Sequence, residues 1–369
     1  MACRRELRAD DRRSSVGPAW HALMGISHNR GAKLHREWYG EVPLNNEKRI
    51  FEDVELLNEL RAAKFDVALF ELYDWSAVAV FEFSAYHQSL IECFLLFFDM
   101  LAVEKRRRFL RKWRTLAAVT SVQQGLYTSY SDEMSFWERL DNFKFAIEMH
   151  YRLISWQLQL HALARKVSPG FPHLQDLIKQ KTGIILMNVN EFTESPRPTA
   201  NIVRYVGGST IYEPKPLDEK LSAILERRSE NVLFSLGSLA TSKGMPMWLK
   251  QDIMNAFSAF PNTTFIWKYE DEDDAVLFER HSNIVLMKWV PQTDLLANKR
   301  LSLFITHAGK NSVLEAMSFG KPMVAIPLFA DQILNAKIMK RRGLGLVINR
   351  RDLNCDTLKA AIRDVLADG

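Results

Sequence analysis

The chain of 369 residues is 47% hydrophobic and 25% charged, and it carries a formal net charge of +5. This composition excludes a disordered chain, and the length predicts two domains of similar size. The small positive charge favours an anionic ligand only weakly, because a basic surface often serves solubility alone.

No targeting segment, disulfide framework or metal site is predicted. The opening MACRRELRADDRR lacks the apolar centre of a signal peptide, and the apolar run from Ile91 to Val103 is too short to span a bilayer. Cys3, Cys93 and Cys355 have neither paired nor zinc-ligand spacing. We therefore expect a soluble chain whose fold is held together by neither disulfides nor metal.

The first half of the chain alternates between helical and strand patterns. Residues 1–45 are polar and lack periodicity, which predicts loop or disorder. Apolar residues at helical spacing predict a helix over Lys48 to Ala63, and FDVALFEL (65–72) then predicts a buried strand. One or two helices are expected over Phe136 to Arg165, and a strand over Gly183 to Val189.

A segment of linker composition divides the chain. Ser195 to Pro216 carries four prolines and the pair Gly207-Gly208. The expected domains are an N-terminal domain, a linker and a C-terminal domain, at residues 46–208, 209–230 and 231–369. We expect the N-terminal domain to be incomplete and the C-terminal domain to be truncated at its end.

Strands and helices alternate regularly after the linker. Strands are predicted at NVLFSLGS, TFIWKY, IVLMKWV, LSLFITHAG, PMVAIPL and LGLVI. Helices are predicted at MWLKQDIMNAFSAF, NSVLEAMSFG and DQILNAKIMKRRG. This alternation indicates a doubly wound parallel sheet, and the first half shows it less cleanly. We therefore predict an α/β chain with two facing Rossmann-like domains.

Ligands of such sheets bind beyond the carboxyl ends of the strands, where helix N-termini present free N–H groups. The turn His307-Ala308-Gly309-Lys310-Asn311-Ser312 lies between a predicted strand and helix. Gly309 permits close backbone approach, and His307, Asn311 and Ser312 supply donors, which suits a diphosphate bound without metal. The alternative is a helix-capping box formed by Ser312 and Glu315.

Other polar or aromatic residues follow the remaining predicted strands. Trp289 could stack on a planar base and Gln292 could offer its amide edge, or Trp289 could be an ordinary core residue. Asp331 and Gln332 suit paired sugar hydroxyls, or Asp331 could simply cap a helix. Ser238 could add a phosphate donor, or it could belong to a plain turn.

The order and spacing of these residues are more specific than any of them alone. The block reads Trp289-x-Pro-Gln-x-Asp-Leu-Leu, Phe304-Ile-Thr-His-x-Gly-x-Asn-Ser, Glu315, Gly320-x-Pro, Pro327 and Asp331-Gln332. It resembles the signature of the UDP-glycosyltransferase family, which includes the animal UDP-glucuronosyltransferases, and most closely the nematode members. The resemblance extends over most of the chain and implies the GT-B fold, with the donor held by the C-terminal domain.

The resemblance also implies a role for each matched position. Trp289 would stack on uracil, with Gln292 beside the base and ribose, and Glu315 would take the ribose hydroxyls. The diphosphate would be held by His307, Asn311, Ser312 and Ser238, and the sugar by Asp331 and Gln332. The chain departs from the family pattern at Asn298, where a His is frequent, and at Ala308, where a Gly is frequent.

Family resemblance implies inverting transfer of glucuronic acid or glucose to the hydroxyl of a small lipophilic acceptor. A His base would deprotonate that hydroxyl and a carboxylate would orient the His. Glu71 matches the carboxylate position, or it is a solvated strand-end acid. None of His21, His28 and His35 matches the base. An alternative is therefore a module that binds the UDP-sugar without turnover.

Two other function classes are weighed against the resemblance. Asp271-x-Asp273 could be the metal site of a metal-dependent glycosyltransferase, although the acidic run EDEDD is more typical of a solvated loop. The basic segment KRRRFLRKWR could bind nucleic acid, although such segments are more often exposed helix faces. We expect neither metal nor nucleic acid, and the UDP-sugar is a co-substrate. The resemblance implies the lumenal side of the endoplasmic reticulum membrane and a role in detoxification.

Overall fold

The computed structural model describes residues 48–63, 68–71, 76–83, 90–94 and 134–367, the last range with gaps at 192, 195–198, 239, 272 and 330. Residues 1–45, predicted as loop or disorder, lie outside the described residues. The chain divides into two compact units between Gly207 and Gly208. We call the described part before this point the N-terminal unit and the part after it the C-terminal unit.

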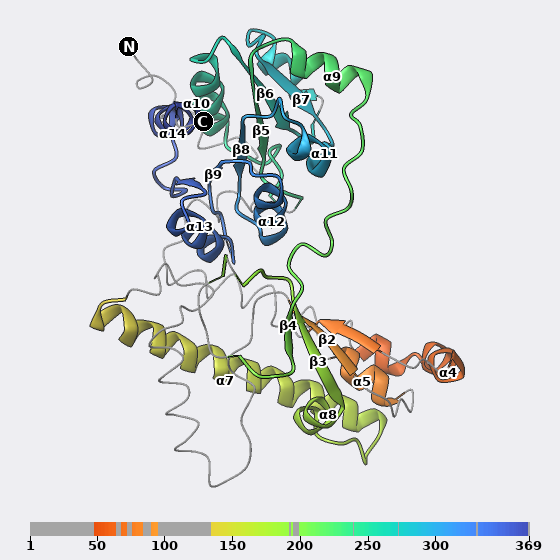
Figure 1. The fold of residues 1–369 in the computed structure, drawn as a ribbon. Coiled ribbons are helices and arrows are strands. Elements are labelled where there is room, and N and C mark those ends of the chain that lie inside the picture. Colours follow the sequence, from red (N-terminus) through yellow and green to blue (C-terminus); the bar gives the residue numbers. More distant parts are fainter. Residues whose placement is uncertain are drawn as a thin grey trace. The chain divides into compact units, whose positions relative to one another are not determined.

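The N-terminal unit contains a four-stranded parallel sheet with the strand order β1-β2-β3-β4 (Figure 1). Its elements in chain order are α4 (Val54–Ala63), β1 (Ala68–Glu71), α5 (Ser76–Phe83), β2 (Leu90–Phe94), α7 (Phe136–Val167), α8 (Leu174–Lys181), β3 (Thr182–Met187) and β4 (Val203–Tyr205). The predicted strands near FDVALFEL and GIILMNV are therefore present as β1 and β3.

The long helix α7 starts at a complete capping box. The Ser135 side chain accepts from the Glu138 backbone N–H, and the Glu138 carboxylate accepts from the Ser135 N–H at 2.7 Å. The sequence predicted one or two helices here, and the structure has one. Its buried residues Leu160 and Ala164 pack with α5, α8 and the end of β3 in the core of this unit.

The C-terminal unit contains the six strands whose apolar runs were predicted from the sequence. Its elements in chain order are α9 (Glu219–Glu226), β5 (Glu230–Ser235), α10 (Met247–Ser258), β6 (Thr263–Lys268), the 3₁₀ helix η3 (Asp273–Phe278), β7 (Ile284–Met287), α11 (Gln292–Ala297), β8 (Leu303–Thr306), α12 (Lys310–Ser318), β9 (Met323–Ala325), α13 (Gln332–Arg341), β10 (Gly345–Val347) and α14 (Cys355–Ala367).

All six strands are parallel, in the order β10-β9-β8-β5-β6-β7. The chain runs outward from β5 through β6 to β7, returns to β8 beside β5, and then runs outward the other way. The order therefore reverses between β5 and β8, and every strand ends at the same edge of the sheet. This arrangement confirms the predicted doubly wound parallel sheet.

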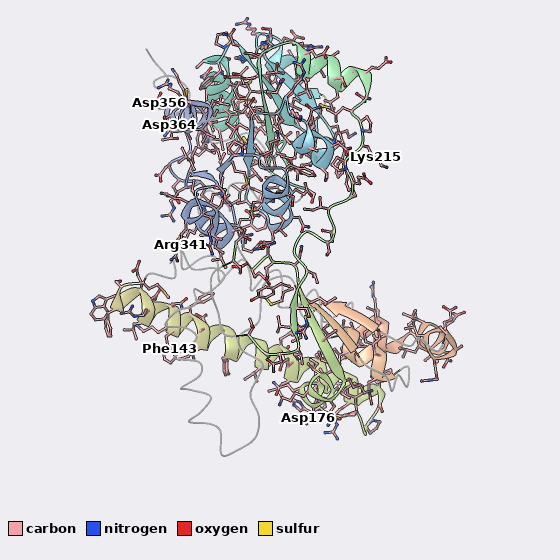
Figure 2. The ribbon with its side chains drawn as sticks, viewed as in Figure 1. Phe143, Asp176, Lys215, Arg341, Asp356 and Asp364 are labelled. Atoms are coloured by element: carbon pink, nitrogen blue, oxygen red, sulfur yellow. The ribbon has the colours of Figure 1, made fainter. Side chains whose placement is uncertain are left out.

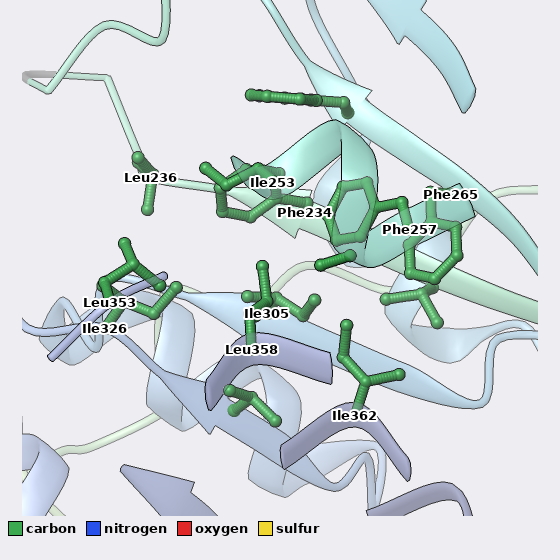
Figure 3. Packing of buried hydrophobic residues seen from close by; sticks show 14 of the residues in the cluster. Phe234, Leu236, Ile253, Phe257, Phe265, Ile305, Ile326, Leu353, Leu358 and Ile362 are labelled. Atoms are coloured by element: carbon green, nitrogen blue, oxygen red, sulfur yellow. The ribbon is translucent and has the colours of Figure 1, made fainter. Parts of the chain in front are cut away.

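Helices cover both faces of this sheet. Alternate strand residues point to opposite sides, so each strand contributes to two cores. Val232 and Phe234 of β5 lie in a core with α10 and α14, whereas Leu233 lies in a core with α9, α11, α12 and α13. Figure 3 shows the first of these cores, in which Phe257 of α10 stacks on Phe265 of β6 at a centroid distance of 4.0 Å. Burial on both faces explains why these strands read as continuous apolar runs.

The segment that precedes β5 packs onto the rest of the C-terminal unit. The Lys215 backbone N–H donates to the Asp294 carboxylate of α11 at 2.8 Å, and Lys215 is labelled in Figure 2. Residues Leu221, Ile224 and Leu225 of α9 are buried in the core beside α11 and α12. At the other end of the unit, Cys355 of α14 is disulfide-bonded, so the prediction that no disulfide stabilises this fold is wrong there.

Candidate functional site

The candidate residues of the C-terminal unit lie beyond the carboxyl edge of its sheet. His307 follows β8 and Gly237 follows β5, so these two residues flank the reversal of strand order. Trp289 follows β7, and Asp331 follows β9 after a short loop. Open parallel sheets bind their ligands at such a reversal.

The imidazole of His307 lies between two glycines. A methyl group in place of hydrogen would lie 2.5 Å from His307 Nε2 at Gly309, and 2.7 Å from Cε1 and Nε2 at Gly237. Gly237 also has a φ of +82°, which glycine adopts far more readily than other residues. The two glycines therefore give the ring a position that no other residue pair would leave open.

His307 is a neutral side chain at physiological pH. Its burial, with a smaller contribution from the Lys268 charge, lowers its pKa from 6.5 to about 4. Its Nδ1 lies 3.5 Å from the Thr306 hydroxyl. A neutral imidazole provides one donor and one acceptor, so His307 can donate a hydrogen bond without placing a charge in the site.

The turn after His307 leads directly into a helix. Ala308 has a φ of +62°, and its carbonyl accepts from the Asn335 side chain at 3.1 Å. Gly309 is the N-cap of α12 and offers no side-chain cap. Ser312 is therefore the third residue of the helix, and its interpretation as the start of a capping box is wrong. The dipole of α12 favours an anion at this end of the helix.

Three candidate residues meet between α11 and α12. The Gln292 side-chain N–H donates to the Ser312 hydroxyl at 3.2 Å and to the Glu315 carboxylate at 2.7 Å. Burial raises the pKa of Glu315, and the Gln292 hydrogen bond partly offsets this effect. The amide edge predicted to face a base is thus partly engaged inside the protein, and the Glu315 carboxylate is held in a fixed orientation.

Trp289 is exposed, with 72% of its surface accessible, so its interpretation as a core residue is wrong. The Lys268 ammonium lies over its ring at 5.5 Å from the centroid. Lys268 itself is buried at the end of β6 and donates to the Gly237 carbonyl at 2.7 Å. The indole therefore has a cation against its ring and a large surface available to a ligand.

Asp331 and Gln332 both make internal hydrogen bonds. Asp331 is the N-cap of α13 without a side-chain cap bond, so it does not cap the helix in the predicted sense. Its carboxylate accepts from Asn335 at 2.7 Å, and burial raises its pKa. The side-chain carbonyl of Gln332 accepts from the backbone N–H groups of Leu328 and Phe329. The Gln332 amide nitrogen is the end of this side chain that can still donate to a ligand.

Some predicted residues are exposed, and the side chains of others are not described. Ser238 and Asn311 are exposed beside the same edge of the sheet. Glu71 ends β1, but its side chain lies outside the described part of the structure, as do His21, His28 and His35. The basic segment KRRRFLRKWR also lies outside the described residues.

The sequence analysis missed Lys268 and Asn335 as parts of this region. Lys268 contacts residues after two neighbouring strands, and Asn335 joins Asp331 to the Ala308 carbonyl. From the sequence, only the contact between Asp331 and Asn335 could have been expected, because the two residues are one helical turn apart.

Within the described residues, no group of three or more His, Cys, Asp or Glu side chains could hold a metal ion. Asp271, the first acid of the alternative metal site, forms an ion pair with Lys243 at 2.6 Å. No helix in the described ranges is both long and apolar enough to cross a membrane. The carboxyl edge thus combines neutral donors, a helix N-terminus and an exposed aromatic ring, which together suit an anion bearing a planar base.

Comparison with known proteins gives a family and a set of relatives. A family model described as "UDP-glucoronosyl and UDP-glucosyl transferase" matches residues 30–369. A putative UDP-glucuronosyltransferase of Caenorhabditis elegans, ugt-56, is 30% identical over 313 residues, which is 82% of this chain and 56% of the relative. UDP-glucuronosyltransferase 1A9 of Mus musculus is 28% identical over 88% of this chain and 59% of its own length. The chain spans about half the length of the curated relatives it matches.

Solved structures resemble the chain in fold. Os79 of O. sativa in complex with UDP has a TM-score of 0.57 at 17% identity, over 93% of this chain and 78% of its own. The spinosyn forosaminyltransferase SpnP has a TM-score of 0.57 at 16% identity, over 86% of this chain and 71% of its own. At this identity the likeness concerns the fold, and it confirms the predicted GT-B class.

Proposed function

The chain belongs to the family of UDP-glucuronosyl and UDP-glucosyl transferases, and from this premise we propose that its C-terminal unit binds the UDP part of a UDP-sugar. The observation that carries the proposal is the neutral imidazole of His307, held between Gly237 and Gly309 directly before α12. A diphosphate placed there meets hydrogen-bond donors and the positive end of a helix dipole.

The proposed diphosphate contacts come from neutral groups. His307 donates through its ring N–H. Ser238 and Asn311 have exposed side chains at the same edge of the sheet and would donate as well. Gly309 permits the approach of a phosphate to the backbone of the turn, and Ser312 lies in the first turn of α12. Such a site needs no metal, because the dipole and the N–H groups stabilise the negative charge.

The uridine is proposed to lie against Trp289 and above α11. The exposed indole supplies a stacking surface, and Gln292 lies at the start of the following helix. Glu315 already accepts a hydrogen bond from Gln292, so ribose hydroxyls would donate to a carboxylate whose orientation is set in advance.

The sugar is proposed to bind at Asp331 and Gln332. The Asp331 carboxylate accepts from sugar hydroxyls, and the Gln332 amide nitrogen donates to one. Neither residue selects a carboxylate on the sugar, so glucose and glucuronic acid are both compatible with these contacts.

We propose that the whole protein transfers the sugar with inversion. The acceptor oxygen attacks the anomeric carbon, the bond from that carbon to the diphosphate oxygen breaks, and UDP leaves with the bonding electron pair. A base removes the acceptor proton, and Glu71 would orient that base. A UDP-sugar-binding module without turnover is the alternative, because no described residue takes the role of the base.

The acceptor and the compartment are proposed from the relatives. The relatives are UDP-glucuronosyltransferases, which supports a small lipophilic hydroxyl compound as the acceptor, bound by the N-terminal unit. Family resemblance is the basis on which we propose association with the endoplasmic reticulum membrane on its lumenal side.

Calorimetry of the full chain with UDP tests the proposed donor site. We expect UDP to bind equally well with a chelator and with added manganese, because the proposed contacts are neutral donors and a helix N-terminus. A requirement for manganese would favour the metal-dependent alternative at Asp271 instead. The absence of UDP binding under either condition would refute the proposed function.

Trp289→Ala is expected to weaken UDP binding while leaving the fold nearly unchanged. Stacking of a base on an aromatic ring contributes roughly 1–3 kcal/mol, whereas an exposed side chain contributes little to stability. The binding constant and the urea midpoint of the same variant decide between these effects. An unaltered UDP affinity would show that the base binds elsewhere.

Trp137→Ala is a matched control for that variant. Trp137 is also highly exposed, with 73% of its surface accessible, but it lies at the start of α7 in the N-terminal unit. Its replacement should change neither the UDP affinity nor the urea midpoint appreciably.

A further inference from the structure

Lys268 connects the loops that follow two different strands. It is the last residue of β6, and β6 lies between β5 and β7 in the sheet. Its ammonium donates to the carbonyl of Gly237, after β5, at 2.7 Å. The same ammonium lies over the ring of Trp289, after β7, at 5.5 Å from the centroid. One side chain therefore fixes the distance between two parts of the candidate nucleotide site.

The surroundings of Lys268 account for all its donors. An ammonium has three N–H bonds, and Lys268 has the Gly237 carbonyl, the Trp289 ring and the Glu270 carboxylate as partners, the last at 3.4 Å. Its side chain is only 8% exposed. A buried lysine whose donors are all occupied, one of them by a carboxylate, is poorly suited to bind a phosphate directly.

The Glu270 carboxylate extends this connection into the loop after β5. Its second oxygen accepts from the backbone N–H of Ser242 at 2.7 Å. The Ser242 hydroxyl in turn donates to the Lys268 carbonyl at 3.1 Å. The loop that begins at Gly237 is thus attached to the end of β6 at two places.

We propose that Lys268 is a positioning residue for the nucleotide, and that its ammonium sets the Trp289 indole and the Gly237 turn relative to each other. The inference rests on the proposed function, because it assigns a role to a group that stands behind the proposed UDP contacts. Gly237 contacts the His307 ring, so Lys268 acts on both the base side and the diphosphate side of the site. The Lys268 charge also helps to keep the His307 pKa low.

The central experiment compares Lys268→Met, Lys268→Arg and wild type in the full chain, with UDP and uridine as separate ligands. Lys268→Met should weaken both ligands by roughly tenfold, because the indole loses its cationic support. Lys268→Arg keeps a cation over the ring and should recover most of the affinity. If Lys268→Met weakens UDP but leaves uridine unchanged, Lys268 acts on the phosphates and the proposal is overturned.

Lys321→Met is the matched control. Lys321 also donates to two backbone carbonyls, those of Asn298 and Leu301, each at 2.8 Å. These contacts lie at the opposite, amino-terminal edge of the same sheet, before β8 and β9. Its replacement should lower the urea midpoint without changing the affinity for either ligand. An equal loss of affinity in this control would mean that general destabilisation, not positioning, explains the Lys268 result.

Two further measurements separate this inference from the proposed function. In a Trp289→Ala background, Lys268→Met should have little remaining effect on uridine, because the two residues act through one contact. Without any ligand, Lys268→Met should make Trp289 more accessible to acrylamide. The readout is the quenching of tryptophan fluorescence, and the part due to Trp289 is the part that is lost when Trp289 is replaced by Phe. If wild type binds no UDP, the proposed function fails, and unchanged quenching would refute the positioning role independently.

Discussion

Gly309→Ala is expected to weaken UDP binding by roughly ten- to a hundredfold. The added methyl would lie 2.5 Å from His307 Nε2, and Gly237 prevents the ring from moving to the other side. Displacing the ring removes a hydrogen bond to a charged ligand, which contributes about 1.5–3 kcal/mol, and 1.4 kcal/mol corresponds to a factor of ten. Overpacking should also lower the free energy of unfolding by about 1–3 kcal/mol. Calorimetry and urea unfolding measure the two effects.

Two variants test whether the His307 contact causes this loss. Gly320→Ala lies at the other end of α12, has a φ of +61° and meets nothing within 4 Å. It should lower stability through backbone strain but leave the UDP affinity unchanged. In a His307→Ala background, Gly309→Ala should weaken binding little further, because the clash partner is gone. Normal UDP binding by Gly309→Ala itself would place the diphosphate away from His307.

Acidification from pH 7 to pH 4 is expected to lower the free energy of unfolding by about 3 kcal/mol through His307 alone. The folded pKa is depressed to about 4 from 6.5, so the unfolded chain takes up the proton first as the pH falls. The His307 contribution is therefore complete above pH 6.5 and is lost progressively down to pH 4. Each pKa unit corresponds to about 1.36 kcal/mol.

The measurement is the difference between wild type and His307→Gln in urea unfolding at several pH values. Burial raises the pKa of Asp331 and Glu315, so their contributions have the opposite sign, but both carboxylates are present in both proteins and cancel in the difference. Proton NMR of the His307 ring gives its pKa directly. A pKa near 6.5 would show that the ring is accessible to water and that the site is not organised as described.

The strands of the C-terminal unit could be predicted because each is buried on both faces. Strands such as β6 and β8 are buried along their whole length, so they read as apolar runs bounded by polar loops. The helix α9 had no such signal. It lies within the range 209–230 that was assigned to a linker, and its three buried residues are recognisable only against the core they enter.

The sequence could predict that the candidate residues follow strands, but it could not predict their contacts. His307 and Trp289 each follow an apolar run, and that position alone suggests the carboxyl edge of a parallel sheet. Lys268 could not be found in this way, because its importance depends on β6 having β5 and β7 as neighbours. The internal bonds of Gln292 were equally hidden, since they join α11 to α12 across 20 and 23 residues of sequence.

The hydrogen bond from Lys215 to Asp294 helps to decide at which residue a fragment should begin if the nucleotide-binding part is expressed alone. A fragment that starts at Asn231 would lack α9 and would leave the core surface under Leu221, Ile224 and Leu225 open to water. Each such side chain contributes roughly 1.5–3 kcal/mol when buried, and a whole domain is stable by only about 5–15 kcal/mol. The useful first residue is therefore Gly208 or earlier, because the polypeptide that arrives at β5 is already part of the domain.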